Sequence, residues 1–139
     1  MPAREAGDAM AAYRLKDSVL TRGERPFFAV LMAVVPERYV VCPGIGLIEL
    51  FDVAGGDRNW KALNPIISKR VDFVVCERST MQPVCGIELD DASHGRWDRR
   101  VRDEFVEHLF ERTGLRLVRF STRYEYNPAD VAARLNLAQ

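Results

Sequence analysis

The chain contains two neighbouring apolar segments that each carry acidic side chains: Val71-Asp72-Phe73-Val74-Val75-Cys76 and Pro83-Val84-Cys85-Gly86-Ile87-Glu88-Leu89-Asp90-Asp91. Both have the character of strands, and a hairpin loop near residues 77–82 would bring them side by side. Strand alternation directs Glu88 and Asp90 to the same face of the sheet. A carboxylate in an apolar strand is costly unless a partner compensates it. A hard divalent cation, which prefers carboxylate oxygens, is the natural candidate.

These acids also have a structural interpretation. Asp is favoured in turns, so in this interpretation Asp72 and Asp90 simply mark the ends of their strands. We prefer the same interpretation for Asp91. The apolar neighbours of Asp72 and Glu88 favour a site, because burial of an uncompensated carboxylate is costly. We therefore expect the carboxylates of Asp72, Glu88 and Asp90 to gather at one edge of a sheet, where one cation would bridge at least two of them.

Hydrophobic periodicity and turn signals predict the remaining elements. In chain order these are a helix from the Thr21-Arg22-Gly23-Glu24 capping box to Pro36, an interrupted strand or short hairpin over Tyr39–Cys42 and Ile45–Phe51, a polar loop over Ala54–Asn64, strands Val71–Glu77 and Val84–Asp90, a helix over Asp98–Thr113, a strand over Leu115–Phe120 and a helix over Pro128–Leu137. The buried stripe of the long helix is expected to consist of Val101, Phe105, Val106, Leu109 and Phe110. Val131 and Leu135 should face inward from the last helix.

Length and composition limit the class of protein. The chain has 139 residues, of which 47% are hydrophobic and 29% charged, so it is long enough for one folded domain and is not disordered. We expect a flexible N-terminus over residues 1–12 and a single domain over 13–139. No apolar run approaches the roughly 20 residues that span a membrane, and the first residues lack a signal-peptide core. We therefore expect a cytoplasmic location and no membrane partner. The odd number of cysteines argues against a disulfide framework, and we expect Cys76 and Cys85, which lie in apolar strands, to be small core residues.

The charge distribution favours a nucleic-acid partner although the net charge is zero. The cations are 17 Arg and 3 Lys, and Arg suits forked contacts with phosphate, although a biased base composition of the gene gives the same excess. The basic residues Arg96, Arg99, Arg100 and Arg102 follow directly on the acidic run. Acids beside basic residues suit a site that holds a cation and a polyanion together.

The predicted order of helix, three strands, helix and strand resembles the core of the restriction-endonuclease-like superfamily, the PD-(D/E)XK nucleases. More specifically, Val-Asp-Phe at 71–73, Glu-Leu-Asp-Asp-x-x-His at 88–94 and Arg-Asp at 102–103 resemble an uncharacterised bacterial domain family grouped with the very-short-patch-repair endonucleases. The resemblance covers about residues 13–135, including Leu20–Phe28 as its first helix and Gly114–Arg119. It implies an α/β fold with an αβββαβ core, a mixed central sheet flanked by helices, and a C-terminal helix.

The resemblance also implies roles for individual residues. Asp72 matches the main metal ligand, Glu88 matches the acid of the third strand, and Asp90 stands where the superfamily pattern has Lys. That departure removes a positive charge, and Asp90 would instead bind metal or hold a water. His94 matches a histidine near the site in the repair-type branch, and Glu24 matches a first-helix acid that lines the site in several relatives.

Each of these assignments has a structural alternative. Glu24 also completes the capping box, and the two roles are compatible. His94 would otherwise be an exposed loop histidine, although neighbouring acids raise a His pKa toward the useful range. For Arg102 and Asp103 we favour an ion pair that supports the site, and we expect His108 on the surface.

The resemblance implies a metal-dependent DNA endonuclease-like domain that hydrolyses phosphodiester bonds in DNA repair or defence. One or two Mg²⁺ or Mn²⁺ held by Asp72 and Glu88 would activate a water, which Asp90 or His94 would orient or deprotonate. The DNA backbone would be held by a basic group comprising Arg96, Arg99, Arg100, Lys69 and Arg70. The alternative is a catalytically inactive module that keeps the nuclease fold to bind DNA or a protein partner, and the missing Lys supports it.

Overall fold

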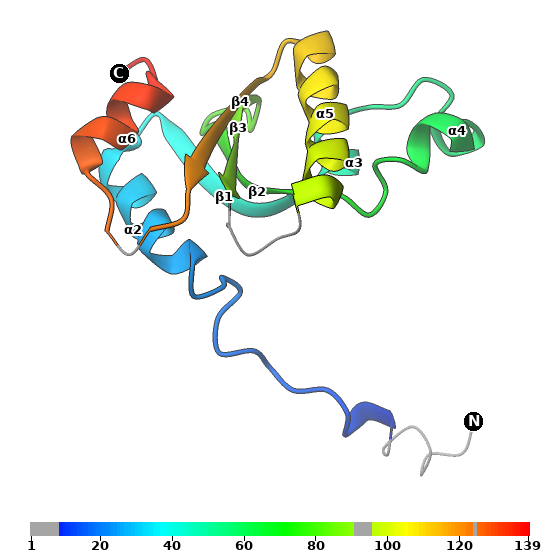
Figure 1. Ribbon diagram of the computed structural model, residues 1–139, viewed down its shortest axis with the longest axis horizontal. Helices are drawn as coiled ribbons and strands as arrows, with labels where there is room; N and C mark the ends of the chain where they lie inside the picture. Colours follow the sequence, from blue (N-terminus) through cyan, green and yellow to red (C-terminus); the bar gives the residue numbers. More distant parts are fainter. Residues whose placement is uncertain (1–8, 91–95, 124) are drawn as a thin grey trace.

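The centre of the molecule is a mixed four-stranded sheet with helices on both faces, as a computed structural model of the chain shows (Figure 1). The structure describes residues 9–90, 96–123 and 125–139, and the side chains within these ranges except those of residues 96–103. The strands are β1 Tyr39–Gly46, β2 Arg70–Glu77, β3 Pro83–Asp90 and β4 Arg116–Ser121. Their spatial order is β1-β2-β3-β4. The first three strands are antiparallel neighbours, and β4 pairs with β3 in parallel.

The helices form a layer on each face of the sheet. Their bounds are α2 Glu24–Val34, α3 Leu47–Leu50, η1 Gly56–Arg58, α4 Trp60–Leu63, α5 Arg96–Thr113 and α6 Pro128–Leu135. Helices α2 and α6 cover one face, and α5 covers the other as the crossover from β3 to β4 (Figure 1). The mixed α/β architecture and the C-terminal helix predicted from the sequence are confirmed.

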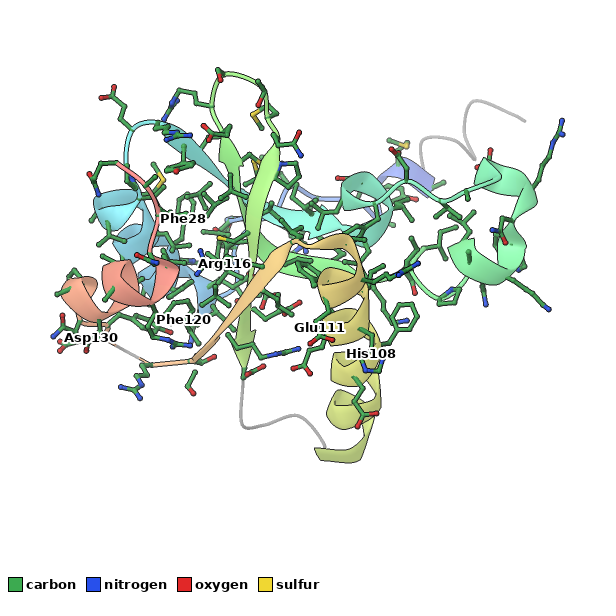
Figure 2. All side chains as sticks on the ribbon, turned by 90° about the horizontal axis from the view of Figure 1, so that it is seen from above. Phe28, His108, Glu111, Arg116, Phe120 and Asp130 are labelled. Atoms are coloured by element: carbon green, nitrogen blue, oxygen red, sulfur yellow. The ribbon has the colours of Figure 1, made fainter. Side chains whose placement is uncertain are left out.

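Two separate hydrophobic clusters lie on the two faces of the sheet. The first contains Phe27 and Leu31 of α2, the inward-facing residues of the four strands, and Val131 and Leu135 of α6. The second lies under α5 and includes Phe110. Figure 2 shows Phe120 on the side of α6, whereas His108 and Glu111 lie along α5 on the other side. The sheet is therefore buried on both faces, and β2 runs through the middle of the core.

Gly86 allows α5 to approach β3 closely. A Cβ atom at Gly86 would lie 2.7 Å from Cε1 and 2.9 Å from Cζ of Phe110, closer than real side chains allow. Phe110 is almost fully buried, with 2% of its surface exposed. The missing side chain of Gly86 thus fixes the distance between the crossover helix and the strand that carries Glu88 and Asp90.

The long helix confirms part of the predicted stripe. Val106 and Phe110 are buried, Leu109 is half-buried against the second cluster, and Phe105 is 37% exposed. Val101 falls among the residues whose side chains are not described. Phe110 is thus the aromatic residue that packs against Gly86, whereas the predicted burial of Phe105 is wrong. His108 is exposed, as predicted (Figure 2).

The stretch after β1 differs from the prediction. The segment predicted as a strand over Ile45–Phe51 divides at Gly46, because Leu47–Leu50 forms the short helix α3. Leu47 is fully buried, and its N–H donates to the carbonyl of Lys69 at 2.9 Å. An apolar run of this length fits either a strand or a buried helical turn, so periodicity alone does not separate them.

No described helix has the length and apolar character needed to cross a membrane.

Candidate functional site

Strands β2 and β3 separate at Asp72, the first acidic residue of the apolar segments described above. Their ladder ends at the Phe73–Ile87 pair. One step further, the Leu89 N–H donates to Oδ2 of Asp72 at 2.7 Å, so a side-chain hydrogen bond replaces the backbone ladder. The Asp72 carboxylate therefore lies in the gap between the ends of the two strands.

The sheet is also twisted at Asp72. Residues two apart on a regular strand share a face, yet Val71 packs in the cluster under α5 and Phe73 in the cluster under α2 and α6. Gly44, which lies opposite Asp72 on β1, has a positive φ of 60° that favours glycine. The local irregularity of both strands turns Asp72 toward the end of β3.

A cavity of about 410 Å³ opens at this point beneath α5. Asp72 of β2, Glu88 of β3 and Arg119 of β4 line it, together with Lys69 and Arg70 at the start of β2. Three adjacent strands thus contribute two carboxylates and a guanidinium to one polar space. The cavity therefore brings together four of the residues predicted for the site, namely Lys69, Arg70, Asp72 and Glu88. Arg119 also lines it, although it was not predicted.

Arg119 links the end of β3 to α5. Its ladder neighbour on β3 is Glu88, and its Nη1 lies 3.4 Å from Oδ1 of Asp90. Its Nε lies 3.3 Å from Oε1 of Glu107 on α5. The Arg119 side chain is 23% exposed and that of Asp90 is 35% exposed, so this ion pair is partly shielded from solvent. The arrangement holds Asp90 against a positive charge on the neighbouring strand.

Glu24 completes the predicted capping box and also lines a cavity beside Asp72. The Thr21 N–H donates to Oε1 of Glu24 at 2.8 Å, and the Glu24 N–H donates to Oγ1 of Thr21 at 3.2 Å, which confirms the capping box. Glu24 also lines a second cavity of about 300 Å³ that shares Asp72 and Arg70 with the first. The first helix is therefore anchored through a carboxylate that faces the candidate site.

Lys69 and Arg70 are both held by backbone carbonyls at the rim. The Nζ of Lys69 donates to the carbonyl of Pro65 and lies 4.8 Å from the centre of the Phe105 ring. Nη2 of Arg70 donates to the carbonyl of Gly44 at 2.9 Å. Arg70 lies between the two cavities, so its guanidinium is the cation that both cavities share.

The remaining predicted site residues lie outside the described part of the molecule. His94 belongs to the segment 91–95, and so does Asp91, for which we expect a structural role at the end of its strand. The backbone of α5 includes the residues whose side chains are not described: Arg96, Arg99, Arg100, Arg102 and Asp103. Their predicted roles in DNA binding, catalysis and structural support stay predictions.

The donor set around the cavity suits a magnesium ion with few protein ligands. Mg²⁺ commonly takes one or two carboxylates and keeps several waters, and Asp72 and Glu88 line one cavity. Within the described residues, no three His, Cys, Asp or Glu side chains form a group that could hold a metal ion. Asp90 lies against Arg119, so the fit with a cation rests on the pair Asp72 and Glu88.

Two residues at the site were missed by sequence reasoning. Arg119 interrupts the apolar strand over Leu115–Phe120, the same signal that singled out Asp72, and its significance depends on the parallel pairing with β3. Lys16 lines the second cavity beside Asp72. It precedes the first helix in a stretch without periodicity, so no sequence pattern marks it.

A family model described as Protein of unknown function (DUF2726) matches residues 16–139, which is nearly the whole chain. The chain belongs to the DUF2726 family. No curated protein and no solved structure matches it. The match to DUF2726 includes all the described residues of both cavities.

Proposed function

We propose that this DUF2726 domain is a metal-dependent DNA endonuclease-like domain with a restriction-endonuclease-like core, and that it hydrolyses phosphodiester bonds. One observation carries the proposal. Asp72 of β2 and Glu88 of β3 line the same cavity as the cationic side chains Arg70 and Arg119. Carboxylates for a divalent cation beside guanidinium groups for phosphate are the components that hydrolysis of a nucleic-acid backbone needs.

Each residue would contribute a definite task. Asp72 and Glu88 would hold Mg²⁺ or Mn²⁺, which polarises a phosphate and lowers the pKa of a bound water. Asp90 or His94 would orient or deprotonate the attacking water. Arg96, Arg99 and Arg100, together with the rim cations Lys69 and Arg70, would contact the DNA backbone without reading its sequence.

Arg119 supports this proposal at the position where the resemblance is weakest. Asp90 replaces the Lys of the superfamily pattern, which removes a positive charge from β3. The guanidinium of Arg119 approaches Asp90 from β4 and lines the cavity. It would therefore restore a positive charge beside the reacting phosphate, where charge develops in the transition state.

The second candidate is a catalytically inactive module that binds DNA or a protein partner through the same fold. The Asp90–Arg119 ion pair and the hydrogen bond from Leu89 to Asp72 favour it, because both would remain useful to the fold after loss of catalysis. The metal response separates the two candidates, since an inactive module has no need to keep a cation site.

The test is cleavage of duplex, mismatched, branched and single-stranded DNA with Mg²⁺ and with Mn²⁺. Asp72→Asn is the informative variant, because the amide keeps an acceptor for the Leu89 N–H and loses the charge that a cation requires. Asp57→Asn, an exposed acid on η1, is the matched control. We expect cleavage by the wild type and by Asp57→Asn, and none by Asp72→Asn.

Thermal melting with and without metal completes the test. A cation that binds only the folded state raises the melting temperature by mass action. Mg²⁺ or Mn²⁺ should therefore stabilise the wild type and not Asp72→Asn. If the wild type cleaves none of the substrates and ignores both ions while still binding DNA, the binding module replaces the nuclease.

A further inference from the structure

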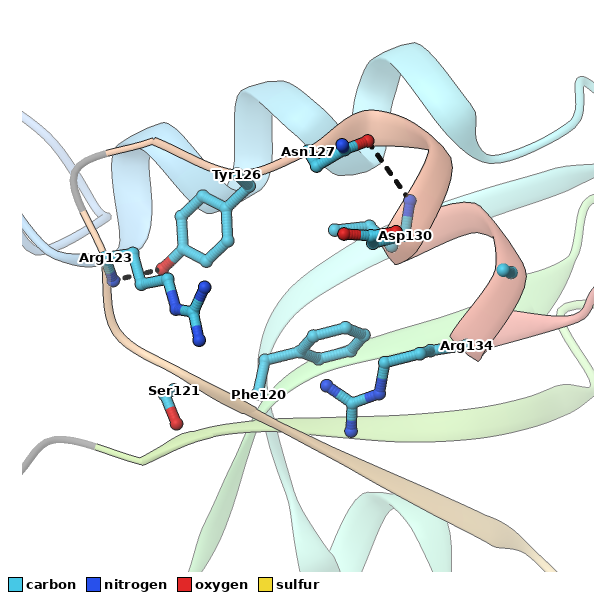
Figure 3. A pocket seen from close by; sticks show the side chains of 9 residues that line it. Phe120, Ser121, Arg123, Tyr126, Asn127, Asp130 and Arg134 are labelled. Atoms are coloured by element: carbon cyan, nitrogen blue, oxygen red, sulfur yellow. Dashed lines mark hydrogen bonds between the residues drawn. The ribbon is translucent and has the colours of Figure 1, made fainter.

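A third cavity, of about 370 Å³, lies beside α6 (Figure 3), on the face of the sheet that α2 and α6 cover. Its walls are the end of β4, the following loop and α6, which contribute Phe120, Arg123, Tyr126, Asp130 and Arg134. Phe120 belongs to the cluster under α2 and α6, whereas its neighbour Arg119 faces α5. The size falls within the roughly 300–1,000 Å³ of small-molecule sites.

Two guanidinium groups face this cavity. Figure 3 shows those of Arg123 and Arg134 directed toward the Phe120 ring. Arg134 is fixed, because its guanidinium carbon lies 4.2 Å from the centre of that ring and Nη2 donates to the carbonyl of Arg119. Among the described residues, no carboxylate lies within ion-pair distance of Arg123. The guanidinium of Arg123, which has no carboxylate partner among the described residues, and the fixed guanidinium of Arg134 together suit a phosphate group.

Hydrogen bonds hold the backbone at Arg123 and at the start of α6. The Arg123 N–H donates to the hydroxyl of Tyr126 at 2.8 Å (Figure 3). Tyr126 is itself anchored by an edge contact with Phe27, with ring centres 5.1 Å apart. The oxygen of Asn127 accepts hydrogen bonds from Ala129 and Asp130, so the start of α6 is also fixed. The Arg123 backbone is therefore tied to Tyr126, which packs against the core of the molecule.

The other residues that line the cavity, Asp130 and Tyr126, disfavour binding of a simple inorganic anion. Asp130 adds a carboxylate that repels a purely anionic ligand and accepts hydrogen bonds from a neutral one. Tyr126 adds an aromatic ring of the kind on which an unpaired base stacks. A ligand with a phosphate at one end and a planar, hydrogen-bonding group at the other would complement the two arginines, Asp130 and Tyr126. A nucleotide has this composition.

The cavity begins next to the candidate site. Ser121, which lines it, is the ladder neighbour of Asp90 on β3. The Thr122 N–H donates to the carbonyl of Asp90 at 3.1 Å. A nucleic-acid strand that crosses the shared end of β3 and β4 would place one phosphate near the site acids and a neighbouring nucleotide over the Arg123 cavity.

We propose that this cavity is a subsite for one unpaired nucleotide of the DNA strand, with the phosphate held by Arg123 and Arg134 and the base against Tyr126. The inference rests on the proposed nuclease function and adds to it a substrate class, namely DNA with a single-stranded segment at the cut. A base inside a continuous duplex is excluded, because the neighbouring base pairs cover both of its faces and leave none for stacking on Tyr126.

The test is binding of a fluorescent 12-nucleotide single strand and of its blunt duplex, measured by anisotropy in EDTA so that no cleavage occurs. Arg123→Ala should weaken binding of the single strand about tenfold, the loss expected for a charge-assisted hydrogen bond. The slope of log affinity against log salt should fall by about 0.7. Duplex binding should change less than twofold, and Arg123→Lys should recover part of the loss.

Arg58→Ala is the matched control, because Arg58 is exposed on η1 at the other end of the molecule from α6 (Figure 1). Equal binding of the single strand by Arg123→Ala, Arg58→Ala and the wild type would overturn the subsite. An equal loss with duplex and single strand would overturn the preference for an unpaired nucleotide. Arg123-dependent binding without cleavage on any substrate would support the subsite while contradicting the nuclease. Asp72-dependent cleavage with Arg123-independent binding would do the reverse.

Discussion

Asp72 has a measurable structural role besides its proposed function. Its carboxylate accepts the Leu89 N–H where the backbone ladder ends. Asp72→Ala leaves that N–H without its acceptor, which should cost about 1–3 kcal/mol of unfolding free energy. Asp72→Asn keeps an acceptor oxygen and should leave the free energy nearly unchanged without metal. Urea unfolding in EDTA measures both. Equal stabilities of the two variants would show that the hydrogen bond contributes little.

The thiol of Cys76 makes stability depend on alkaline pH. Burial, followed by the neighbouring Cys42, raises the pKa of Cys76 from 9.0 to about 11. A pKa that is higher in the folded than in the unfolded state stabilises the fold below about pH 9, and this contribution is lost as pH rises toward 11. The urea midpoint should therefore fall less steeply between pH 8.5 and 10.5 in Cys76→Ala than in the wild type. Parallel pH profiles would contradict the shift.

The sequence allowed prediction of individual site residues only where the local pattern was unusual. Asp72 and Glu88 were identifiable because charges in apolar strands need compensation. Arg119 shows the same pattern, but its partners Asp90 and Glu107 lie on other elements, and only the parallel pairing brings them together. The predicted burial of Cys76 and Cys85 is confirmed.

At the level of elements, the contact between α5 and β3 depends on Gly86. Gly86→Ala should push Phe110 out of its place and cost about 1–3 kcal/mol, as overpacking does. Phe110→Leu alone should lose part of its core contribution, yet it should make room for the new methyl group. The double variant is therefore expected to be more stable than the sum of the single effects predicts. Urea unfolding of the four proteins in a double-mutant cycle measures this coupling, and strict additivity would contradict it.

Elements with terminal signals were predicted well, and those without them were not. Helix α2 follows the capping box, and Gly114 ends α5 with a φ of 79°. Helices α3 and α4 fall in segments predicted as strand and loop. Each has four residues, too few for a helical period to be visible, and α3 depends on the distant carbonyl of Lys69. Tertiary contacts and not local sequence decide such short elements.

At the scale of the whole molecule, we expect different parts of the N-terminal arm, residues 9–19, to contribute differently to the free energy of unfolding. The outer part of the arm runs away from the body of the molecule (Figure 1), and Leu15 is 96% exposed, whereas Lys16 and Val19 line the second cavity. Removal of residues 1–12 should change the unfolding free energy by less than about 0.5 kcal/mol. Removal of residues 1–21 also deletes Thr21 of the capping box and the contact of Leu20 with the first core cluster.

The longer deletion should therefore cost at least the ~0.5–2 kcal/mol of a lost cap. Thermal melting of the two shortened chains beside the full chain tests this difference. If both deletions destabilise equally, residues 9–12 make contacts that this arrangement lacks.

The element order predicted for the whole molecule is confirmed for the helix before β1, the strands β1, β2 and β3, the long helix and β4. The two layers of helices follow from this order, because a parallel pair of strands needs a crossover that covers one face. The cavities do not follow from it. They depend on the separation of β2 from β3 at Asp72 and on the depth of α5 at Gly86, which are properties of packing.

The parallel position of β4 also determines when the charges of the site meet as the chain folds. Strands β1 to β3 are joined in sequence order, so their antiparallel pairing closes only short stretches of chain and is favoured early. Arg119 arrives only after α5 has crossed the sheet. We therefore expect Asp72 and Glu88 to be assembled with Lys69 and Arg70 before Arg119 joins them, both during synthesis and during refolding. The last strand to dock is therefore the one that brings the Arg119 cation to Asp90 at the end of β3.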